Sequence, residues 1–188
     1  QTLQGTIGPS SRISTTISRN GDLIHDMYYK LNHGTKIEKE CGCNPTHNMI
    51  NDIECEIGGQ LIDRHYGHWL EVYAKLTEGG NGIQKSCELA ASPSNCNLFQ
   101  AMTLSGGTYP TSASLTTDNS HWVPLRFWFC RNVGNALPLI ALQYHEVKIN
   151  TTFTSAISGS ATVLSTNIKD KLSLWVNYIY LDTDERRR

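Results

Sequence analysis

The sequence predicts an all-β protein, an eight-stranded antiparallel jelly-roll sandwich with one short inserted helix and long surface loops. Two observations lead to this fold class. Several segments alternate apolar and polar residues with a period of two, and Gly, Ser, Thr and Asn are plentiful between them. Hydrophobic residues make up 39% of the 188 residues and charged residues 18%. Because there is neither an internal repeat nor a shift in composition, we expect a single folded core.

The most regular alternation lies at residues 12–18, where isoleucine or threonine alternates with polar side chains. Asn20 and Gly21 follow at once. This pair favours a tight hairpin because both residues tolerate positive φ. We therefore expect residues 23–31 to return as the neighbouring strand.

A second alternation places three acidic residues, the first of them Asp52, opposite Ile53, Cys55 and Ile57. It ends at Gly58-Gly59, where positive φ can turn the backbone. A second pair of strands is therefore expected around this turn.

The last third of the chain is rich in β-branched and aromatic residues. A turn at residues 131–135 divides the first two of its apolar segments. The strands expected here are residues 123–130, 139–149 and 172–181.

Residues 64–77 have a different period, with apolar side chains at i, i+3, i+4 and i+7, which predicts the inserted helix. Asp63 is its expected N-cap, and Gly79 lies just beyond its end. The apolar positions are Trp69, Val72, Tyr73 and Leu76. Residues 34–47, 79–97 and 105–120 show neither period and are expected to be surface loops.

The sequence contains no Gly-rich phosphate loop, no G-x-S-x-G elbow and no H-E-x-x-H pair. We therefore expect no catalytic residues, no cofactor and no enzymatic activity. A net charge of -1 gives no general attraction to phosphate backbones, so direct nucleic-acid binding is not expected. No apolar run approaches the ~20 residues that cross a bilayer, so membrane insertion is not expected either.

Two groups of side chains have the composition of a metal site. Cys41 and Cys43 with His47 supply three zinc ligands, but structural zinc sites use four ligands and C-x2-4-C spacing. We expect a solvated loop with ordinary thiols.

The second group, His65, His68 and Glu71, resembles the metal-binding set of cupins, which are also jelly rolls. Cupin ligands lie on strands as H-x-H, whereas these histidines are spaced H-x-x-H on an expected helix. We expect exposed histidines on a structural helix and no metal.

Two further polar groups are interpreted as structural. His145 and Glu146 lie in an expected strand, where neighbours point to opposite faces and cannot form an acid-base pair. Residues 182–185 have a D-x-D pattern, but Thr183 is placed to cap a helix whose first turn is acidic.

Asn150 begins the N-x-S/T sequon Asn150-Thr151-Thr152 and is the one candidate glycosylation site. Such triplets are common by chance and need a dedicated glycosylation route to be used. We expect Asn150 to be unmodified.

Four long segments resemble, in order, the first jelly roll of the major capsid proteins of iridoviruses, algal large DNA viruses and other nucleocytoplasmic large DNA viruses. Together they span nearly the whole chain. The segments are residues 14–23 (STTISRNGDL), 56–69 (EIGGQLIDRHYGHW), 129–148 (FCRNVGNALPLIALQYHEVK) and 175–188 (WVNYIYLDTDERRR).

The resemblance implies a double jelly-roll protein that forms pseudo-hexameric homotrimers, which tile an icosahedral shell. Residues 1–182 would then form the first jelly roll, and residues 183–188 would begin a connector helix to a second one. The implied partners are the protein itself, neighbouring capsomers and minor capsid proteins. The implied location is the virion, after assembly in the host cytoplasm.

Assembly in the cytosol would keep thiols reduced, so we expect mostly free cysteines. They are Cys41, Cys43, Cys55, Cys87, Cys96 and Cys130. Two alternative functions remain open: a carbohydrate-binding jelly roll that uses aromatics such as Tyr109 and Trp122, and a cupin-like metalloenzyme that uses His65 and His68.

Overall fold

The computed structural model describes residues 3–5, 7–8, 10–32, 45–77, 120–154 and 172–186. These residues form two antiparallel β-sheets, as the sequence predicts. The strands are β1 (Arg12–Thr16), β2 (Leu23–Asn32), β3 (Ile50–Ile57), β4 (Gln60–Tyr66), β5 (Ser120–Pro124), β6 (Leu137–Pro138), β7 (Val147–Phe153) and β8 (Leu172–Ile179). The helices are α1 (Pro45–Asn48), α2 (Gly67–Thr77), α4 (Trp128–Arg131), α5 (Thr183–Arg186) and the 3-10 helix η3 (Val133–Asn135).

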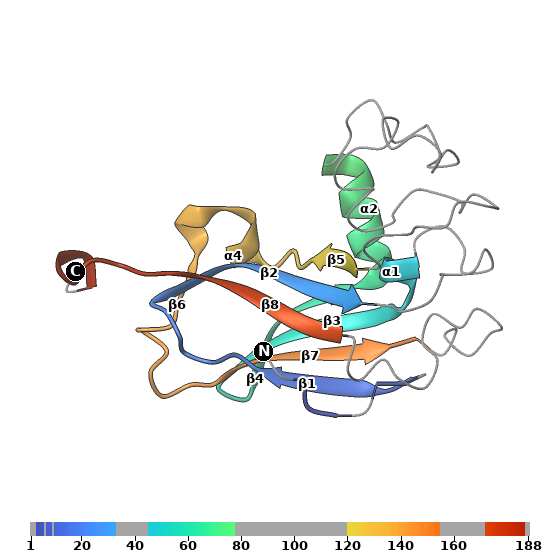
Figure 1. Ribbon diagram of the computed structural model, residues 1–188, viewed down its shortest axis with the longest axis horizontal. Helices are drawn as coiled ribbons and strands as arrows, with labels where there is room; N and C mark the ends of the chain where they lie inside the picture. The colour runs from blue at the N-terminus through green and yellow to red at the C-terminus, as the bar shows by residue number, and fades with distance from the viewer. Residues whose placement is uncertain are drawn as a thin grey trace.

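The first sheet has the strand order β1-β7-β3-β4. The second is centred on β2, which pairs with β8 along one edge and with β5 and β6 along the other. In Figure 1, β2 and β8 lie above β1 and β7, and α2 stands at the top of the view beside α1 and β5. Among the described residues, no helix is long and apolar enough to cross a membrane.

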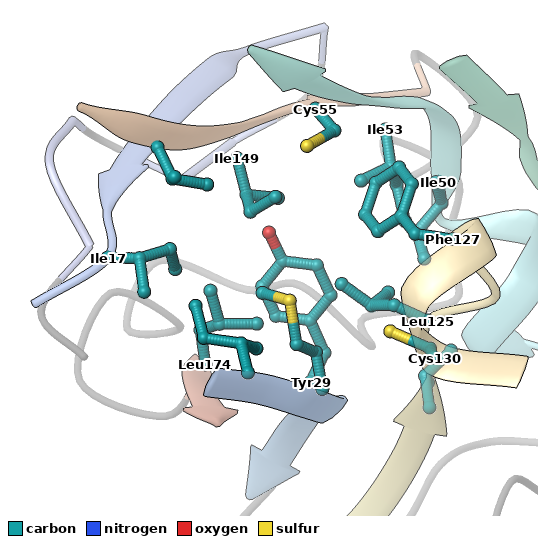
Figure 2. Packing of buried hydrophobic residues seen from close by; sticks show 14 of the residues in the cluster. Ile17, Tyr29, Ile50, Ile53, Cys55, Leu125, Phe127, Cys130, Ile149 and Leu174 are labelled. Atoms are coloured by element: carbon teal, nitrogen blue, oxygen red, sulfur yellow. The ribbon is translucent and has the colours of Figure 1, made fainter. Parts of the chain in front are cut away.

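The core lies between the two sheets, because the period-two alternation turns one face of each strand inward. Ile13, Ile53 and Ile149 face it from the first sheet, and Met27 and Leu174 face it from the second. Figure 2 shows this packing.

One buried polar contact crosses the core. The phenol of Tyr29 on β2 lies 2.6 Å from the hydroxyl of Thr151 on β7, and Figure 2 shows Tyr29 reaching toward the strand that carries Ile149. Burial raises the pKa of Tyr29 to about 12, so this group stays neutral.

The prediction of a hairpin at Asn20-Gly21 is wrong. Strand β1 pairs with β7 and β2 pairs with β8, so residues 17–22 cross from one sheet to the other. The crossing is held by Ile17 N–H, which donates to Val147, and by Asp22 N–H, which donates to Ile179. Gly21 is needed here for space, because a Cβ atom would lie 2.6 Å from Cβ of Tyr178.

The hairpin expected at Gly58-Gly59 is confirmed. It joins β3 to β4, and the two glycines have φ angles of 59° and 85°. These values lie in the left-handed region that glycine adopts without a steric penalty.

The inserted helix is present, but it begins at Gly67 and residues 60–66 form β4. Asp63 therefore lies within β4, opposite Cys55, and is not a helix cap. Pairing with β3 outweighs the local helical period, as tertiary context often does.

The buried face of α2 also differs from the prediction. Leu70 and Ala74 are buried, whereas Val72 is 54% and Leu76 79% exposed. The helix starts close to the backbone at Gly67, where a Cβ atom would lie 2.2 Å from the carbonyl oxygen of Ile50.

Two strands predicted in the last third are shorter than expected. Strand β5 ends at Pro124, and residues 128–131 form α4. Phe129 and Cys130, which the prediction placed in a strand, lie in this helical turn and are both buried.

Strand β7 begins at Val147, so His145 and Glu146 lie before it and not in a strand. The preceding turns are held by the Arg19 guanidinium, which donates to the carbonyls of Leu142, Gln143 and His145. The expected strand at residues 172–181 is confirmed as β8.

The loop expected at residues 34–47 is partly wrong, because residues 45–48 form α1, in which Thr46 and His47 are buried. Residues 34–44 lie outside the described residues, as does the expected loop at 79–97. Of the loop expected at 105–120, residues 105–119 also lie outside them, and Ser120 begins β5.

The close approach at Gly67 leads to a first prediction. Gly67→Ala places a methyl group against backbone carbonyls that cannot move aside, so it should lower the free energy of unfolding by about 1–3 kcal/mol or more. Urea denaturation measures this loss. Gly8→Ala is the control, because nothing lies within 4 Å of its Cβ position, and it should change stability by less than about 0.5 kcal/mol. Equal stability of the two variants would contradict the packing described.

Candidate functional site

The two groups that have the composition of a metal site were expected to bind no metal, and those of their residues that the structure describes make other contacts. Nδ1 of His47 lies 2.8 Å from Oε2 of Glu71, which links α1 to α2. Cys41 and Cys43 lie outside the described residues. No group of three or more His, Cys, Asp or Glu side chains in the described part of the chain could hold a metal ion.

The cupin-like set does not converge either. His65 lies on β4 and not on a helix, and its ring stacks between Trp69 and Phe127. His68 is exposed on α2, while Glu71 pairs with His47. The expectation of exposed histidines is therefore right for His68 and wrong for His65.

The acidic segment at residues 182–185 begins a helix, as interpreted. Its cap differs, because Oδ1 of Asp182 accepts the Thr183 N–H at 2.6 Å and the Asp182 carbonyl accepts the Glu185 N–H at 3.1 Å. Asp182, and not Thr183, therefore lies at the start of α5. Its carboxylate bonds the helix backbone, which is the ordinary role of an N-terminal acidic residue.

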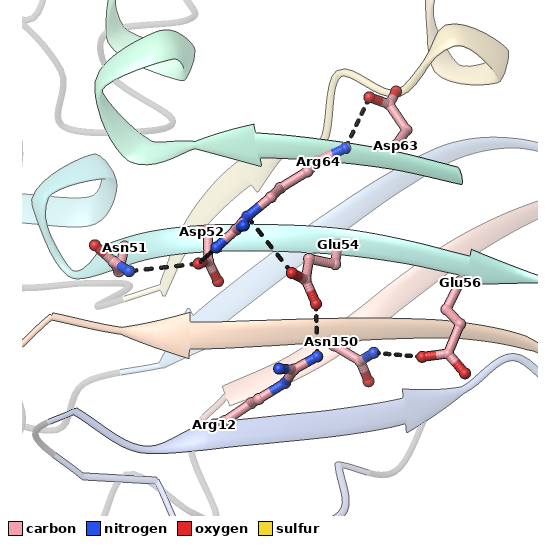
Figure 3. Close-up of polar contacts among 8 residues, drawn as sticks. All are labelled: Arg12, Asn51, Asp52, Glu54, Glu56, Asp63, Arg64 and Asn150. Atoms are coloured by element: carbon pink, nitrogen blue, oxygen red, sulfur yellow. Dashed lines mark hydrogen bonds and ion pairs between the residues drawn. The ribbon is translucent and has the colours of Figure 1, made fainter. Parts of the chain in front are cut away.

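The outer face of the first sheet carries a network of charged side chains (Figure 3). Arg64 on β4 contacts Asp52 at 2.5 Å and Glu54 at 3.5 Å, and Arg12 on β1 contacts Glu54 at 2.5 Å. The alternation of β3 predicted that its acidic residues share this face. Because Arg64 of β4 and Arg12 of β1 contact the acids of β3 from either side, much of the charge of this face is neutralised within the chain.

Asp52 is the most buried member of this network, with 5% of its side chain exposed. Burial alone would raise the pKa of Asp52, but hydrogen bonds from Thr152 and Arg64 and the charges of Arg64 and Arg12 outweigh burial and lower it below the usual 3.8. The ionised carboxylate therefore stabilises the sheet at neutral pH.

Asn150 lies on β7 within the same face and is buried. Its Nδ2 donates to Oε2 of Glu56 at 3.0 Å. A glycan attached to this nitrogen would have to displace the Glu56 side chain. It would also have to pass between the side chains of two neighbouring strands to reach solvent.

The outer face of the second sheet carries aromatic residues instead. Trp175 on β8 lies opposite Tyr28 on β2, and Trp122 on β5 lies opposite Lys30. The two indoles meet edge to face at 5.5 Å, and the Lys30 ammonium lies 5.0 Å from the ring centre of Trp122 and 5.8 Å from that of Trp175. We call these four residues the aromatic cluster.

Of this cluster, only Trp122 was predicted from the sequence as an exposed aromatic contact residue; Tyr109, predicted with it, lies outside the described residues. A signal for Trp175 was present in the sequence, because the apolar Leu172 and Leu174 alternate with it; the two leucines are buried and Trp175 is 51% exposed. Exposed clusters of Trp and Tyr with a cation are typical of protein contact surfaces.

Two cysteines fall within the described residues, Cys55 and Cys130, and both are free and buried. Burial raises the pKa of each thiol to about 12, which keeps it protonated and unreactive.

Comparisons with known proteins agree with this architecture. The family model described as "Major capsid protein N-terminus" matches residues 1–182. The chain belongs to the major capsid protein family. The major capsid protein of Pyramimonas orientalis virus is 41% identical over 195 residues, which cover 100% of this chain and 44% of that protein. The major capsid protein of Paramecium bursaria Chlorella virus 1 is 35% identical, with 100% of this chain and 40% of the relative covered.

Among solved structures, the fold matches a chain of a quasi-atomic model of the PBCV-1 virus capsid. The TM-score is 0.68 and the sequence identity 35%, over 100% of this chain and 42% of that chain. This match confirms the predicted jelly roll of the capsid proteins. The chain spans less than half the length of these relatives.

The Asp52 network predicts an acid-dependent contribution to stability. Because the folded pKa of Asp52 lies below its unfolded value, this contribution is present above about pH 3.8 and is lost as the pH falls through the folded pKa. Asp52→Asn should cost about 1–2 kcal/mol at pH 7, since partly exposed Arg64 is screened by solvent. Urea denaturation at pH 7 and pH 3 checks this. Glu146→Gln, at an exposed site, is the control, and an equal loss of stability in the two variants would contradict the stabilising role of Asp52.

The hydrogen bond of Asn150 predicts that this sequon is unmodified. Intact mass and peptide mapping of protein from virions should show an unaltered Asn150, because its amide is buried against Glu56. A hexose-sized mass excess on the peptide that contains Asn150 would show the opposite.

Proposed function

We propose that this chain is a structural shell protein that forms pseudo-hexameric homotrimeric capsomers, which tile an icosahedral capsid. The observation that carries the proposal is its likeness along its whole length to major capsid proteins of large DNA viruses. The two sheets pack on each other with their inner faces and leave two extended outer faces, which suits a protein that acts by binding other subunits. Its place is then the virion, and assembly occurs in the host cytoplasm.

The proposed partners are further copies of the protein, neighbouring capsomers and minor capsid proteins. Direct nucleic-acid binding, membrane insertion and enzymatic activity are not part of the proposal. The net charge of -1 and the lack of the common catalytic motifs in the sequence support this choice.

We also propose that residues 1–182 form the first of two jelly rolls and that residues 183–188 begin the connector helix between them. Two observations support this: the relatives are more than twice as long as the chain, and α5 begins at Thr183. Two jelly rolls in each of three subunits supply six similar faces, which lets a threefold particle pack in a sixfold lattice. Sequencing the gene beyond the codon for Arg188 tests it, and a stop codon there would overturn it.

The aromatic cluster is the surface that we propose to contact a neighbouring subunit. The first sheet neutralises its charges internally, whereas the cluster presents a half-exposed indole and a cation to the outside. Carbohydrate binding is less well supported by the same residues. A sugar stacks flat on an open ring, but Lys30 lies over both indoles and the indoles are inclined by 64°.

Self-association of the full-length protein gives the decisive test. The wild-type protein should be a homotrimer by light scattering, and Trp175→Ser should weaken the trimer at least tenfold, since buried tryptophans at interfaces contribute about 2 kcal/mol or more. Tyr180→Ser is the matched control, because Tyr180 is an exposed aromatic outside the cluster.

The possible results separate the two parts of the proposal. A monomeric wild-type protein, with no trimer crosslinked in virions, would overturn the capsomer. A stable trimer that Trp175→Ser leaves unchanged would overturn only the role of the aromatic cluster.

A further inference from the structure

A row of stacked rings joins α2 to the core, and a histidine lies in its middle. His65 lies 4.5 Å from Trp69 at an interplanar angle of 15° and 4.7 Å from Phe127 at 24°. The row continues from Trp69 to Tyr73 at 5.0 Å and from Phe127 to Phe129 at 5.7 Å. Of these five rings, the imidazole is the one whose charge ordinarily changes between pH 5 and pH 8.

Cations already occupy the outer end of this row. The Arg131 guanidinium of α4 lies 5.5 Å from the ring centre of Trp69 and 5.6 Å from that of Tyr73, and Arg126 lies 5.4 Å from that of Tyr73. These contacts attach α2 to the segment 125–131 through positive charges on aromatic faces.

The imidazole itself is 6% exposed and meets few charges. On β4, the strand of His65 itself, Oδ2 of Asp63 lies 3.3 Å from Nε2 of the imidazole. The positive charge of Arg131 on α4 also acts on the imidazole. Strand β3 places the apolar Ile53 opposite it, and α2 contributes the ring of Trp69. The nearby acid of α2, Glu71, is paired with His47.

These surroundings favour the neutral ring. Burial lowers the pKa of His65 below 6.5, Arg131 lowers it further, and Asp63 offsets part of the effect. Because the folded pKa is the lower one, the unfolded chain takes up the proton first. The contribution of this site to stability is therefore complete above about pH 6.5 and is lost as the pH falls below that value.

We propose that His65 is a pH-sensitive joint: its protonation puts a second cation beside Arg131 in the ring row and loosens α2 and segment 125–131 from the sheets. The joint lies where the chain leaves the first sheet through α2 and re-enters the second at β5. It depends on the fold of this chain and not on the proposed function.

Amide hydrogen exchange of residues 67–77 in the complete chain, corrected for the intrinsic effect of pH, tests the proposal. Between pH 7.5 and pH 5, the protection of these amides in the wild-type protein should fall by about threefold to about 30-fold. The fall is largest if the imidazole of the folded protein stays neutral throughout, because only the opened form then takes up the proton. His65→Phe keeps a ring in the row but cannot be protonated, so its protection should change less than about twofold.

Two further variants sharpen the result. His68→Gln removes the exposed histidine of α2 and should follow the wild type. Asp63→Asn keeps an oxygen for the Arg64 N–H but removes the negative charge beside the imidazole, so its protection should fall more than that of the wild type.

An NMR titration of His65 in the wild-type protein gives a readout that needs no variant to fold. A midpoint below 6.5, coupled to the loss of protection, is expected. A midpoint at or above 6.5, unchanged wild-type protection, or an equal fall in His65→Phe would each overturn the proposal.

Discussion

The fold depends on two sheets that face each other across a core with little polar content. Tyr29 and Thr151 supply the polar contact that spans this core, from the central strand of one sheet to a central strand of the other. Since each group would lose its partner if either strand shifted by one residue, the pair helps to fix how the sheets are placed.

The two outer faces differ in kind, and this difference bears on assembly. On the first sheet, Arg12 and Arg64 bind the carboxylates of β3, so little charge is left to attract a partner. On the second sheet, Trp122 and Trp175 form a cluster with Lys30. Truncation of an aromatic anchor usually costs more than removal of a screened surface charge, so the second face is the better candidate for contact between subunits.

Helix α2 is held by close backbone packing and by polar and aromatic contacts. Its first residue, Gly67, lies directly against backbone carbonyls, and Glu71 pairs with buried His47 of α1. Its Trp69 ring stacks on the imidazole of His65, beside the core contacts of Leu70. Polar and aromatic contacts of this kind respond to protonation, whereas aliphatic packing does not.

The sequence by itself determined the features that depend on local period and turn chemistry. The inward face of β1, the acidic outer face of β3 and the Gly58-Gly59 turn could all be predicted, because alternation shows which side chains share a face and paired glycines permit positive φ. The family could also be inferred from four long segments.

Only the tertiary structure decided which strands pair, because alternation does not identify a partner. Strand β1 pairs with β7, from which it is separated by more than half of the chain. Gly21 therefore lies in a segment that crosses between the two sheets and not in a hairpin. Only the tertiary structure also places His65 in a strand, because its spacing of four residues from Trp69 fits a helix. The aromatic cluster could be predicted only in part: Trp122 was recognised, but residues from three strands meet there through long-range pairing that no local pattern records.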